Sequence, residues 1–296
     1  MQAKLADDEK TFVYIKRQVD EDIAKKIADL RIAGIYQRKE YRRQYPEGAA
    51  MAHIVGFTDI EDKGLEGIER TFNEQLAGRT GSRRVIRDRL GRVVESTGDG
   101  VPPVDGRDLH LTIDSKIQYF AWQKLRSAVE AQRAKGGSVV VLDVQTGEVL
   151  ALANYPSYDP NNRKNLTGEQ LRNRALTDIY EPGSTMKPVT VALALEQKKV
   201  TPQTVIATDP GKLTIQGATI GDVHNYGTLT VSGVIQKSSN VGVAKIAQRL
   251  SGQDMWENFR HIGIGQKPDL PFPGIASGRL RPWKSWRPIE HATMSY

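Results

Sequence analysis

The segment 181–195 places the strongest restriction on how this chain can fold. A Pro-Gly pair ends whatever structure precedes it, and an apolar run with helical spacing follows. Ser184 is therefore expected at a helix N-terminus, where free backbone N–H groups and the positive end of the dipole lie. Lys187 is one turn further on the same face, so its amine should reach the Ser184 hydroxyl. A hydroxyl beside an amine at a helix start is a candidate nucleophile and base.

A segment rich in glycine and proline, 97–106, is the best domain boundary in the sequence. It predicts an N-terminal domain at 1–105 and a second domain at 106–296. The total of 296 residues suits two ordinary domains. Because helical and strand-like patterns alternate along both, the expected fold class is α+β, with an antiparallel sheet flanked by helices in the second domain.

Local patterns predict the main elements of both domains. In the first domain we expect a helix capped by Asp20, a second helix at 68–76, and strand-like segments at 35–45, 83–88 and 92–96, the last two forming a hairpin about Leu90-Gly91. In the second domain we expect a strand at 109–113, a long helix capped by Asp114, and an antiparallel hairpin made of 138–143 and 148–153. The long apolar content of this hairpin predicts that both of its faces are covered.

Composition excludes several classes of site. The chain has no cysteine, which rules out disulfides and thiolate metal sites. The net charge of +7 is read as a solvated basic surface. No apolar run approaches the roughly 20 residues of a membrane span, and the first residues carry no signal-peptide core. The sequence is thus expected to be soluble as written, or to be a piece whose anchor lies upstream.

The sequence gives little support to other catalytic and binding motifs. The chain has no G-x-S-x-G nucleophile elbow, no Walker A motif and no complete dinucleotide fingerprint. Its histidines lack H-x-x-x-H spacing, so no metal is expected. The arginines of the 83–96 hairpin have no interleaved aromatic residues, so nucleic acid is not an expected partner. His224 lies in a polar turn, and a Ser-His-Asp triad through it is the less favoured interpretation.

A second short motif, Ser238-Ser239-Asn240, lies at a break between two predicted helices. Serine and asparagine are good helix caps, so the motif has a purely structural interpretation. It also offers a hydroxyl that could pass a proton from the Ser184 and Lys187 pair, and an amide that could hold a substrate amide. Each motif by itself leaves both interpretations open.

Together, the S-x-x-K and S-x-N motifs resemble the motif pair of penicillin-binding proteins and serine β-lactamases. The resemblance to class B penicillin-binding proteins extends to 138–153, to the loop 158–163 and, in the first domain, to the segments Tyr45–Gly48, His53–Phe57 and Gly64–Glu69. It covers nearly the whole chain and is closest to the division-specific transpeptidases of Gram-negative bacteria. It identifies 1–105 as an incomplete pedestal (dimerisation-type) domain and 106–296 as a transpeptidase domain incomplete at its C-terminus.

The resemblance implies acyl transfer on peptidoglycan stem peptides, with septal cell-wall synthesis as the setting and β-lactams as covalent inhibitors. Ser184 would be the nucleophile, Lys187 its base, Ser238 a proton relay and Asn240 the group that holds the substrate amide. Ser239 and Glu181 are further candidate substrate-binding residues. No metal or organic cofactor is implied. Division membrane proteins, including a glycan polymerase, would be partners, and the parent protein would act at the periplasmic face of the inner membrane.

The sequence departs from the family pattern at both ends. It contains no N-terminal membrane helix, and no Lys-(Ser/Thr)-Gly motif follows Asn240. The chain as given is therefore expected to acylate poorly or not at all. Two alternatives stay open: a non-catalytic form that docks division proteins, and a serine β-lactamase. The second is less favoured because no E-x-x-x-N context supplies a deacylating carboxylate.

Overall fold

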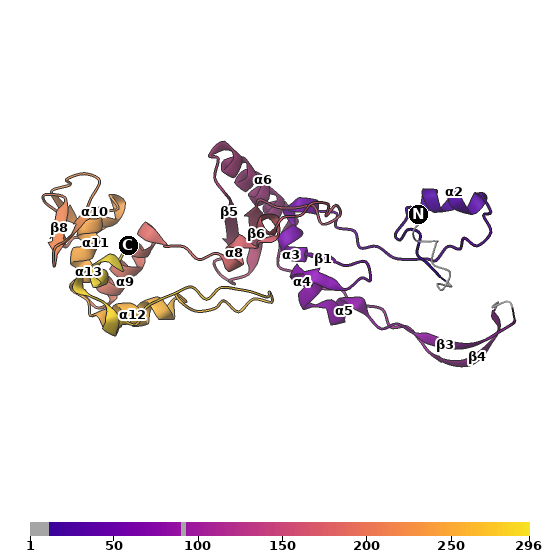
Figure 1. The fold of residues 1–296 in the computed structure, drawn as a ribbon. Helices are drawn as coiled ribbons and strands as arrows, with labels where there is room; N and C mark the ends of the chain where they lie inside the picture. Colours follow the sequence, from indigo (N-terminus) through magenta and orange to yellow (C-terminus); the bar gives the residue numbers. More distant parts are fainter. Residues whose placement is uncertain (1–11, 90–92) are drawn as a thin grey trace. The chain divides into compact units, whose positions relative to one another are not determined.

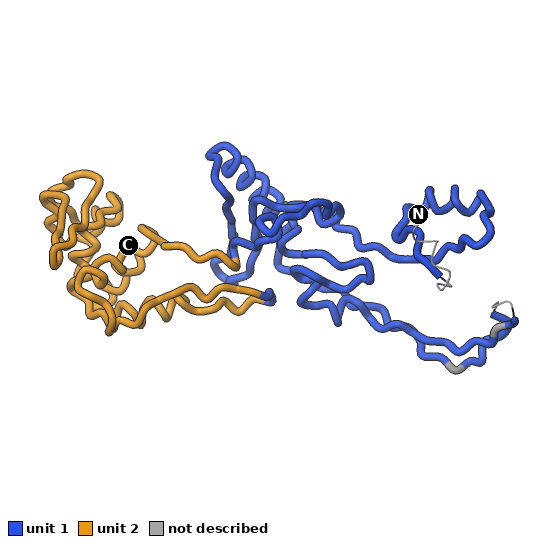
Figure 2. The backbone as a smooth tube through the Cα atoms, viewed as in Figure 1, with its two compact units in different colours: residues 1–175, 271–273 blue, residues 176–270, 274–296 orange. Residues whose placement is uncertain are grey.

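The computed structural model describes residues 12–89 and 93–296 and divides the chain into two compact units (Figures 1 and 2). Unit 1 holds residues 1–175 and 271–273, and unit 2 holds residues 176–270 and 274–296. Helices occur together with strand pairs that are all antiparallel within the described residues, which confirms the α+β class. The units group residues by contact, so the predicted domain boundary at 105 stays a prediction. In this described part, no helix is long and apolar enough to cross a membrane.

The first part of unit 1 is built from short elements. They are α2 (Glu21–Asp29), η1 (Gly48–Ala50), α3 (Ala52–Val55), β1 (Phe57–Thr58), β2 (Gly64–Glu66), α4 (Gly67–Thr71), α5 (Asn73–Ala77), β3 (Ser82–Arg87) and β4 (Val93–Val101). Asp20 precedes α2 as predicted, but its side chain makes no cap hydrogen bond. The helix predicted at 68–76 is interrupted at Phe72, whose backbone leaves the helical region between α4 and α5.

Two predicted strands are wrong. Residues 35–45 and 109–113 form no strand, although their composition favours one. A strand needs a hydrogen-bonded neighbour, and neither segment pairs with another within the described residues. The predicted hairpin of 83–88 and 92–96 is present as β3 and β4, in which Val85 pairs with Ser96. Its predicted turn at Leu90-Gly91 lies outside the described residues.

The second part of unit 1 consists of one long helix on a two-stranded sheet. The elements are α6 (Ser115–Ala131), β5 (Gly137–Leu142), β6 (Val149–Tyr155) and α7 (Gly168–Leu171), followed by α8 (Arg174–Thr177), which begins at the end of unit 1. Asp114 caps α6 as predicted, since its carboxylate accepts hydrogen bonds from the N–H groups of Lys116 and Ile117, both at 2.9 Å. The predicted antiparallel hairpin is confirmed by the pairing of β5 with β6.

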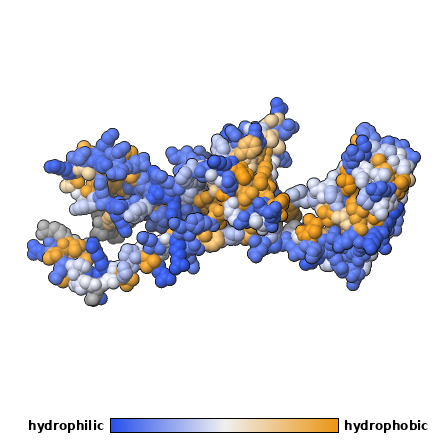
Figure 3. All heavy atoms as spheres, turned by 180° about the vertical axis from the view of Figure 1, so that it is seen from behind, coloured by the Kyte–Doolittle hydropathy of each residue, from blue (hydrophilic) through white to orange (hydrophobic). Residues whose placement is uncertain are grey.

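The prediction that both faces of this hairpin are covered is wrong. Val139 and Val141 pack against the buried side chains of α6, including Leu125. Val140 and Leu142 alternate with them along β5 and are 47% and 52% exposed. Because successive side chains of a strand point to opposite faces, α6 can cover only one of the two. Figure 3 shows hydrophobic side chains at the surface of this part of unit 1.

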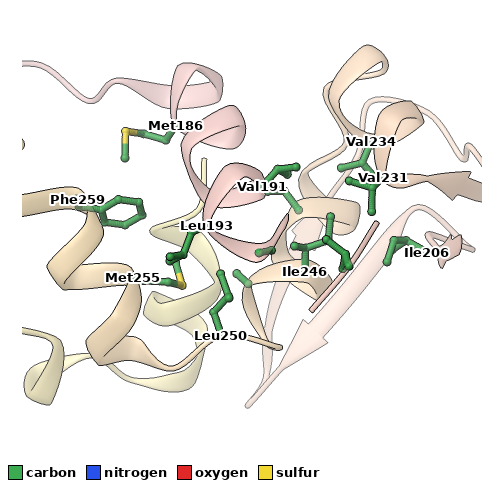
Figure 4. Close-up of a cluster of buried hydrophobic side chains, with 14 residues drawn as sticks. Met186, Val191, Leu193, Ile206, Val231, Val234, Ile246, Leu250, Met255 and Phe259 are labelled. Atoms are coloured by element: carbon green, nitrogen blue, oxygen red, sulfur yellow. The ribbon is translucent and has the colours of Figure 1, made fainter. Parts of the chain in front are cut away.

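Unit 2 is a helical cluster with one small hairpin, formed by two of its strands, and one further antiparallel strand pair. Its elements are η2 (Gly183–Met186), α9 (Lys187–Glu196), β7 (Val205–Ala207), β8 (Lys212–Ile215), β9 (Ala218–Gly221), β10 (Thr228–Thr230), α10 (Val231–Gln236), α11 (Asn240–Ala247), α12 (Gly252–His261), η3 (Trp283–Ser285) and α13 (Pro288–Thr293). Buried side chains from four helices meet in its core, among them Leu193, Val234, Ile246 and Phe259 (Figure 4). This core fixes α9, the helix that carries the candidate nucleophile, against α10, α11 and α12.

Candidate active site

The nucleophile segment folds as its sequence predicts. Gly183 has a φ of +61°, a left-handed conformation that suits glycine, and it opens the single turn η2, which contains Ser184. The turn continues into α9, where Pro188 occupies a first-turn position that needs no backbone N–H partner. Ser184 is exposed, whereas Lys187 is buried, with 2% of its surface accessible. The short turn thus presents the hydroxyl to solvent and turns the amine inward.

The second motif forms the junction of α10 and α11, as predicted. Ser238 has a φ of +53°, which is uncommon for a residue other than glycine. The Ser239 hydroxyl caps α11 by accepting a hydrogen bond from the N–H of Gly242 at 2.8 Å. Asn240 is the first residue of α11. The sharp change of direction at Ser238 exposes its side chain, while Ser239 is fully buried.

The Lys187 amine joins the two motifs. Its Nζ lies 2.9 Å from Ser184 Oγ, which confirms the predicted reach along the helix, and 2.9 Å from Ser238 Oγ. It also donates to the backbone carbonyl of Ser238 at 2.7 Å. A neutral amine has two N–H donors and one lone pair. Two donations to Ser238 leave the lone pair for the hydroxyl proton of Ser184, which is the arrangement that a general base requires.

The surroundings of Lys187 favour that neutral form. Burial disfavours the charged ammonium and lowers the pKa of Lys187 from its ordinary value. The negative charge of Asp222 opposes this effect and raises the same pKa. Nζ also lies 5.5 Å from the centre of the Tyr296 ring, and burial raises the pKa of that phenol. The pKa of the amine is therefore set by burial, which lowers it, and by the charge of Asp222, which raises it.

The other predicted site residues have different positions. The side-chain amide of Asn240 is partly buried and donates to the carbonyl of Gly221 at 3.1 Å. The Ser239 hydroxyl donates to Asp222 at 2.6 Å and is not among the partners of Lys187 Nζ. Glu181 is exposed and precedes η2. The structure therefore brings Ser184, Lys187 and Ser238 together, and the substrate contacts expected of Ser239 and Glu181 stay predictions.

Sequence reasoning missed two residues of this cluster, Asp222 and Tyr296. Asp222 lies directly after β9 in a polar turn, where an aspartate is ordinary, and no motif marks it. Tyr296 follows α13, and no motif marks it either. Within residues 12–89 and 93–296, no group of His, Cys, Asp or Glu side chains is placed to hold a metal ion.

Comparison with known families decides the identity of the fold. The family model "Penicillin binding protein transpeptidase domain" matches residues 137–296, which is more than half of the chain. The chain belongs to the penicillin-binding proteins. A second family model, "Penicillin-binding Protein dimerisation domain", matches residues 1–111 of this penicillin-binding protein.

Named relatives of this penicillin-binding protein are similar over nearly its whole length. It is 44% identical over 295 residues to the probable peptidoglycan D,D-transpeptidase PenA of Neisseria gonorrhoeae, and the aligned region covers 99% of the chain and 50% of PenA. It is 42% identical over 288 residues to the peptidoglycan D,D-transpeptidase FtsI of Escherichia coli, which covers 96% of the chain and 48% of FtsI. The chain thus spans about half the length of the curated relatives it matches.

Solved structures agree with this assignment. Penicillin-binding protein 3 of Mycobacterium tuberculosis, complexed with aztreonam, is 33% identical with a TM-score of 0.74, covering 86% of this chain and 53% of that one. The apo transpeptidase domain of Burkholderia pseudomallei penicillin-binding protein 3 is 54% identical with a TM-score of 0.57, covering 63% of this chain and 52% of that one.

Proposed function

We propose that this penicillin-binding protein carries the nucleophile and the base of a peptidoglycan D,D-transpeptidase. The observation that carries the proposal is the position of Lys187 Nζ, which is within hydrogen-bond distance of the hydroxyls of both Ser184 and Ser238. The similarity to relatives named peptidoglycan D,D-transpeptidase supports the substrate class. The substrates are then the stem peptides of peptidoglycan.

In the first step, Ser184 Oγ attacks the carbonyl carbon between the two terminal D-alanines of a stem peptide. The hydroxyl proton passes to Lys187 Nζ, and the backbone N–H of Ser184 is one donor to the developing oxyanion. When the peptide C–N bond breaks, the departing D-alanine amine takes up a proton through Ser238. The product is an ester between Ser184 and the donor peptide.

In the second step, the amine of a neighbouring stem peptide attacks that ester. The amine loses a proton to the lysine and serine cluster, and Ser184 Oγ regains one as the ester bond breaks. The result is a cross-link between two stem peptides. Asn240, at the start of α11, is proposed to hold the donor's amide during both steps, and Ser239 and Glu181 to make further substrate contacts.

A β-lactam enters the same reaction. Its ring amide replaces the D-Ala-D-Ala peptide bond, and the acyl-enzyme persists because the leaving group stays attached. The similar protein of Mycobacterium tuberculosis, whose structure is complexed with aztreonam, supports this part of the proposal. In the cell, we propose a role in septal wall synthesis at the periplasmic face of the inner membrane, with a glycan polymerase and other division membrane proteins as partners.

The proposal is tested by covalent labelling with a fluorescent penicillin, in the full-length gene product that contains this sequence. Ser184→Ala is expected to abolish labelling, because it removes the hydroxyl that lies 2.9 Å from Lys187 Nζ in the turn η2 and that is proposed to attack the carbonyl. The matched control is Ser232→Ala, which removes an exposed hydroxyl in the first turn of α10 and should label like the parent protein. Label that persists in Ser184→Ala would exclude Ser184 as the nucleophile, whereas an unlabelled parent protein would favour a docking role without catalysis.

A further inference from the structure

Gly221, the last residue of β9, and Asp222, which follows it, are hydrogen-bonded to the second motif and to the residue after it. One carboxylate oxygen of Asp222 accepts a hydrogen bond from Ser239 Oγ at 2.6 Å, and the other accepts one from the backbone N–H of Val241 at 2.9 Å. The neighbouring carbonyl of Gly221 accepts a bond from the Asn240 side chain at 3.1 Å. Three consecutive residues, Ser239 to Val241, are thus hydrogen-bonded to Gly221 and Asp222 at the end of β9.

These contacts have a consequence at Ser238, which directly precedes Ser239 in the chain. Ser238 is in the left-handed conformation, which is strained for a residue other than glycine and persists only when the surrounding structure enforces it. In this conformation both its carbonyl and its hydroxyl point at Lys187 Nζ. Fixing Ser239 and Val241 therefore also fixes the two groups that direct the N–H donors of the amine.

We propose that Asp222 is a positioning residue of the nucleophile and base pair. Its hydrogen bonds to Ser239 and Val241 hold the Ser238 backbone in place. Ser238 then accepts the two N–H donors of Lys187, so that the lone pair of the amine is directed at Ser184. This inference rests on the proposed transpeptidase function and adds a residue to it that no sequence motif marks.

The carboxylate of Asp222 has a second effect, through its charge. It raises the pKa of Lys187 against the larger lowering by burial, so it favours the ammonium form that cannot act as a base. Among the described residues, the titratable groups that face the amine are Asp222 and Tyr296, whose own pKa is raised by burial and by Asp222. The hydrogen bonds of Asp222 favour proton uptake by Lys187, whereas its charge disfavours the neutral amine. Variants that remove only the charge or only a hydrogen bond should therefore change acylation in different ways.

Asp222→Asn tests the charge. The asparagine keeps a carbonyl oxygen for the N–H of Val241 and an amide group beside Ser239, but it removes the negative charge. The rate of acylation by a fluorescent penicillin is expected to rise with pH at a midpoint lower than that of the parent protein. A residue that only capped α11 would leave this midpoint unmoved, so an unchanged pH profile in Asp222→Asn would overturn the role in setting the base.

Ser239→Ala and Asp222→Ala test the position. Ser239→Ala removes the shortest hydrogen bond to Asp222 but keeps the negative charge of Asp222. The acylation rate should therefore fall about 10-fold with an unchanged pH midpoint. Asp222→Ala removes the hydrogen bonds to both Ser239 and Val241. The rate should then fall by about 10- to 100-fold, the effect expected when a catalytic group is misplaced by about 1 Å. The control is Asp254→Asn, a carboxylate in the first turn of α12 that accepts a cap bond, with a parent-like rate expected.

All rates are measured in the full-length gene product that contains this sequence, below the melting temperature of each variant as followed by circular dichroism. If Asp222→Ala does not fold, Ser239→Ala and Asp222→Asn still decide the matter. Parent-like rates in both Ser239→Ala and Asp222→Ala would overturn the positioning role, even if Ser184→Ala abolishes labelling and the proposed function stands. Label in Ser184→Ala would instead remove the proposed function itself, which makes the two failures distinguishable.

Discussion

Gln118 in unit 1 and Lys187 in unit 2 are almost equally buried, at 1% and 2% exposure, and each makes three hydrogen bonds, but their partners differ. The Gln118 amide donates to the carbonyls of Ala50 and Leu152 at 2.6 and 3.2 Å and accepts from the N–H of Leu152 at 2.7 Å. All its partners are neutral backbone groups. Lys187 instead contacts two exposed hydroxyls and one carbonyl.

The comparison distinguishes a buried polar group with a structural role from one with a proposed catalytic role. Gln118 joins α6 to η1 and β6, and each of its bonds is closed within the fold. Lys187 makes the same number of hydrogen bonds, but one of its partners, the Ser184 hydroxyl, is exposed to solvent and is the proposed nucleophile. In unit 1 the buried Gln118 amide supplies hydrogen-bond partners to backbone groups. In unit 2, burial instead lowers the pKa of the Lys187 amine. Four predictions test this distinction.

The largest effect is expected from Lys187→Met. Loss of a general base costs about 10²- to 10⁴-fold, so acylation by a fluorescent penicillin should fall by that factor. The unfolding free energy should stay within about 1 kcal/mol of the parent value, because an apolar chain of similar length replaces a buried amine. The control, Lys245→Met, alters a half-buried lysine on α11 that bonds the carbonyl of Ala207. A rate loss of equal size in both variants would contradict the assignment.

Gln118→Leu should show the opposite pattern. It leaves the carbonyls of Ala50 and Leu152 and one N–H without partners, at about 1–3 kcal/mol for each unsatisfied group. We expect a loss of at least about 3 kcal/mol in the unfolding free energy of unit 1, which is the lower value summed over the three groups, measured by urea denaturation. Gln123→Leu, an exposed position on the same helix, should change stability by less than about 0.5 kcal/mol. Equal stabilities for these two leucine variants would mean that the buried amide is dispensable.

The pH dependence of stability should distinguish the units. His53 in unit 1 is buried and donates to the carbonyl of Gln170 at 2.7 Å, and burial lowers its pKa from 6.5 to about 4. Because the unfolded state binds the proton more readily in this window, stability should rise as pH increases from about 4 to 6.5, by at most about 3 kcal/mol. Lys187 has the same sign, so unit 2 should gain stability as pH rises toward 10.5.

His53→Gln keeps a donor for that carbonyl and should flatten the acid limb of the stability profile, as measured by thermal unfolding at successive pH values. His110→Gln, at an exposed position, should leave the limb as it is. A profile for His53→Gln that still falls between pH 6.5 and 4 would show that other groups produce the acid loss.

The smallest effect is expected on the uncovered face of β5. Val140→Thr combined with Leu142→Thr replaces two exposed apolar side chains, so stability should change by less than about 0.5 kcal/mol for each. Aggregation during concentration should decrease, as light scattering would report, because an apolar strand face is a site of self-association. A loss of several kcal/mol would mean that this face is packed in solution.

Much of the candidate site could be predicted because it is local. The contact between Ser184 and Lys187 follows from helix geometry, which places residues three apart on one face. The cap at Asp114 and the β5–β6 hairpin are local in the same sense, since each depends on residues within a few positions along the chain. Adjacent residues also predicted the break between α10 and α11, but they did not predict the left-handed Ser238 that makes the break useful.

The sequence by itself determined the turn that carries Ser184, the second motif and the resemblance to penicillin-binding proteins. Each of these depends on residues that are consecutive or nearly consecutive in the chain. Only the tertiary structure decided that Asp222 grips the second motif, that Gln118 closes backbone bonds in unit 1, and that one face of β5 is left uncovered. Such contacts join segments far apart in the chain, and an aspartate, a glutamine or a valine has the same local signature whether or not a distant partner meets it. Burial and partnership are properties of the packed chain, and the pKa of Lys187 follows from them.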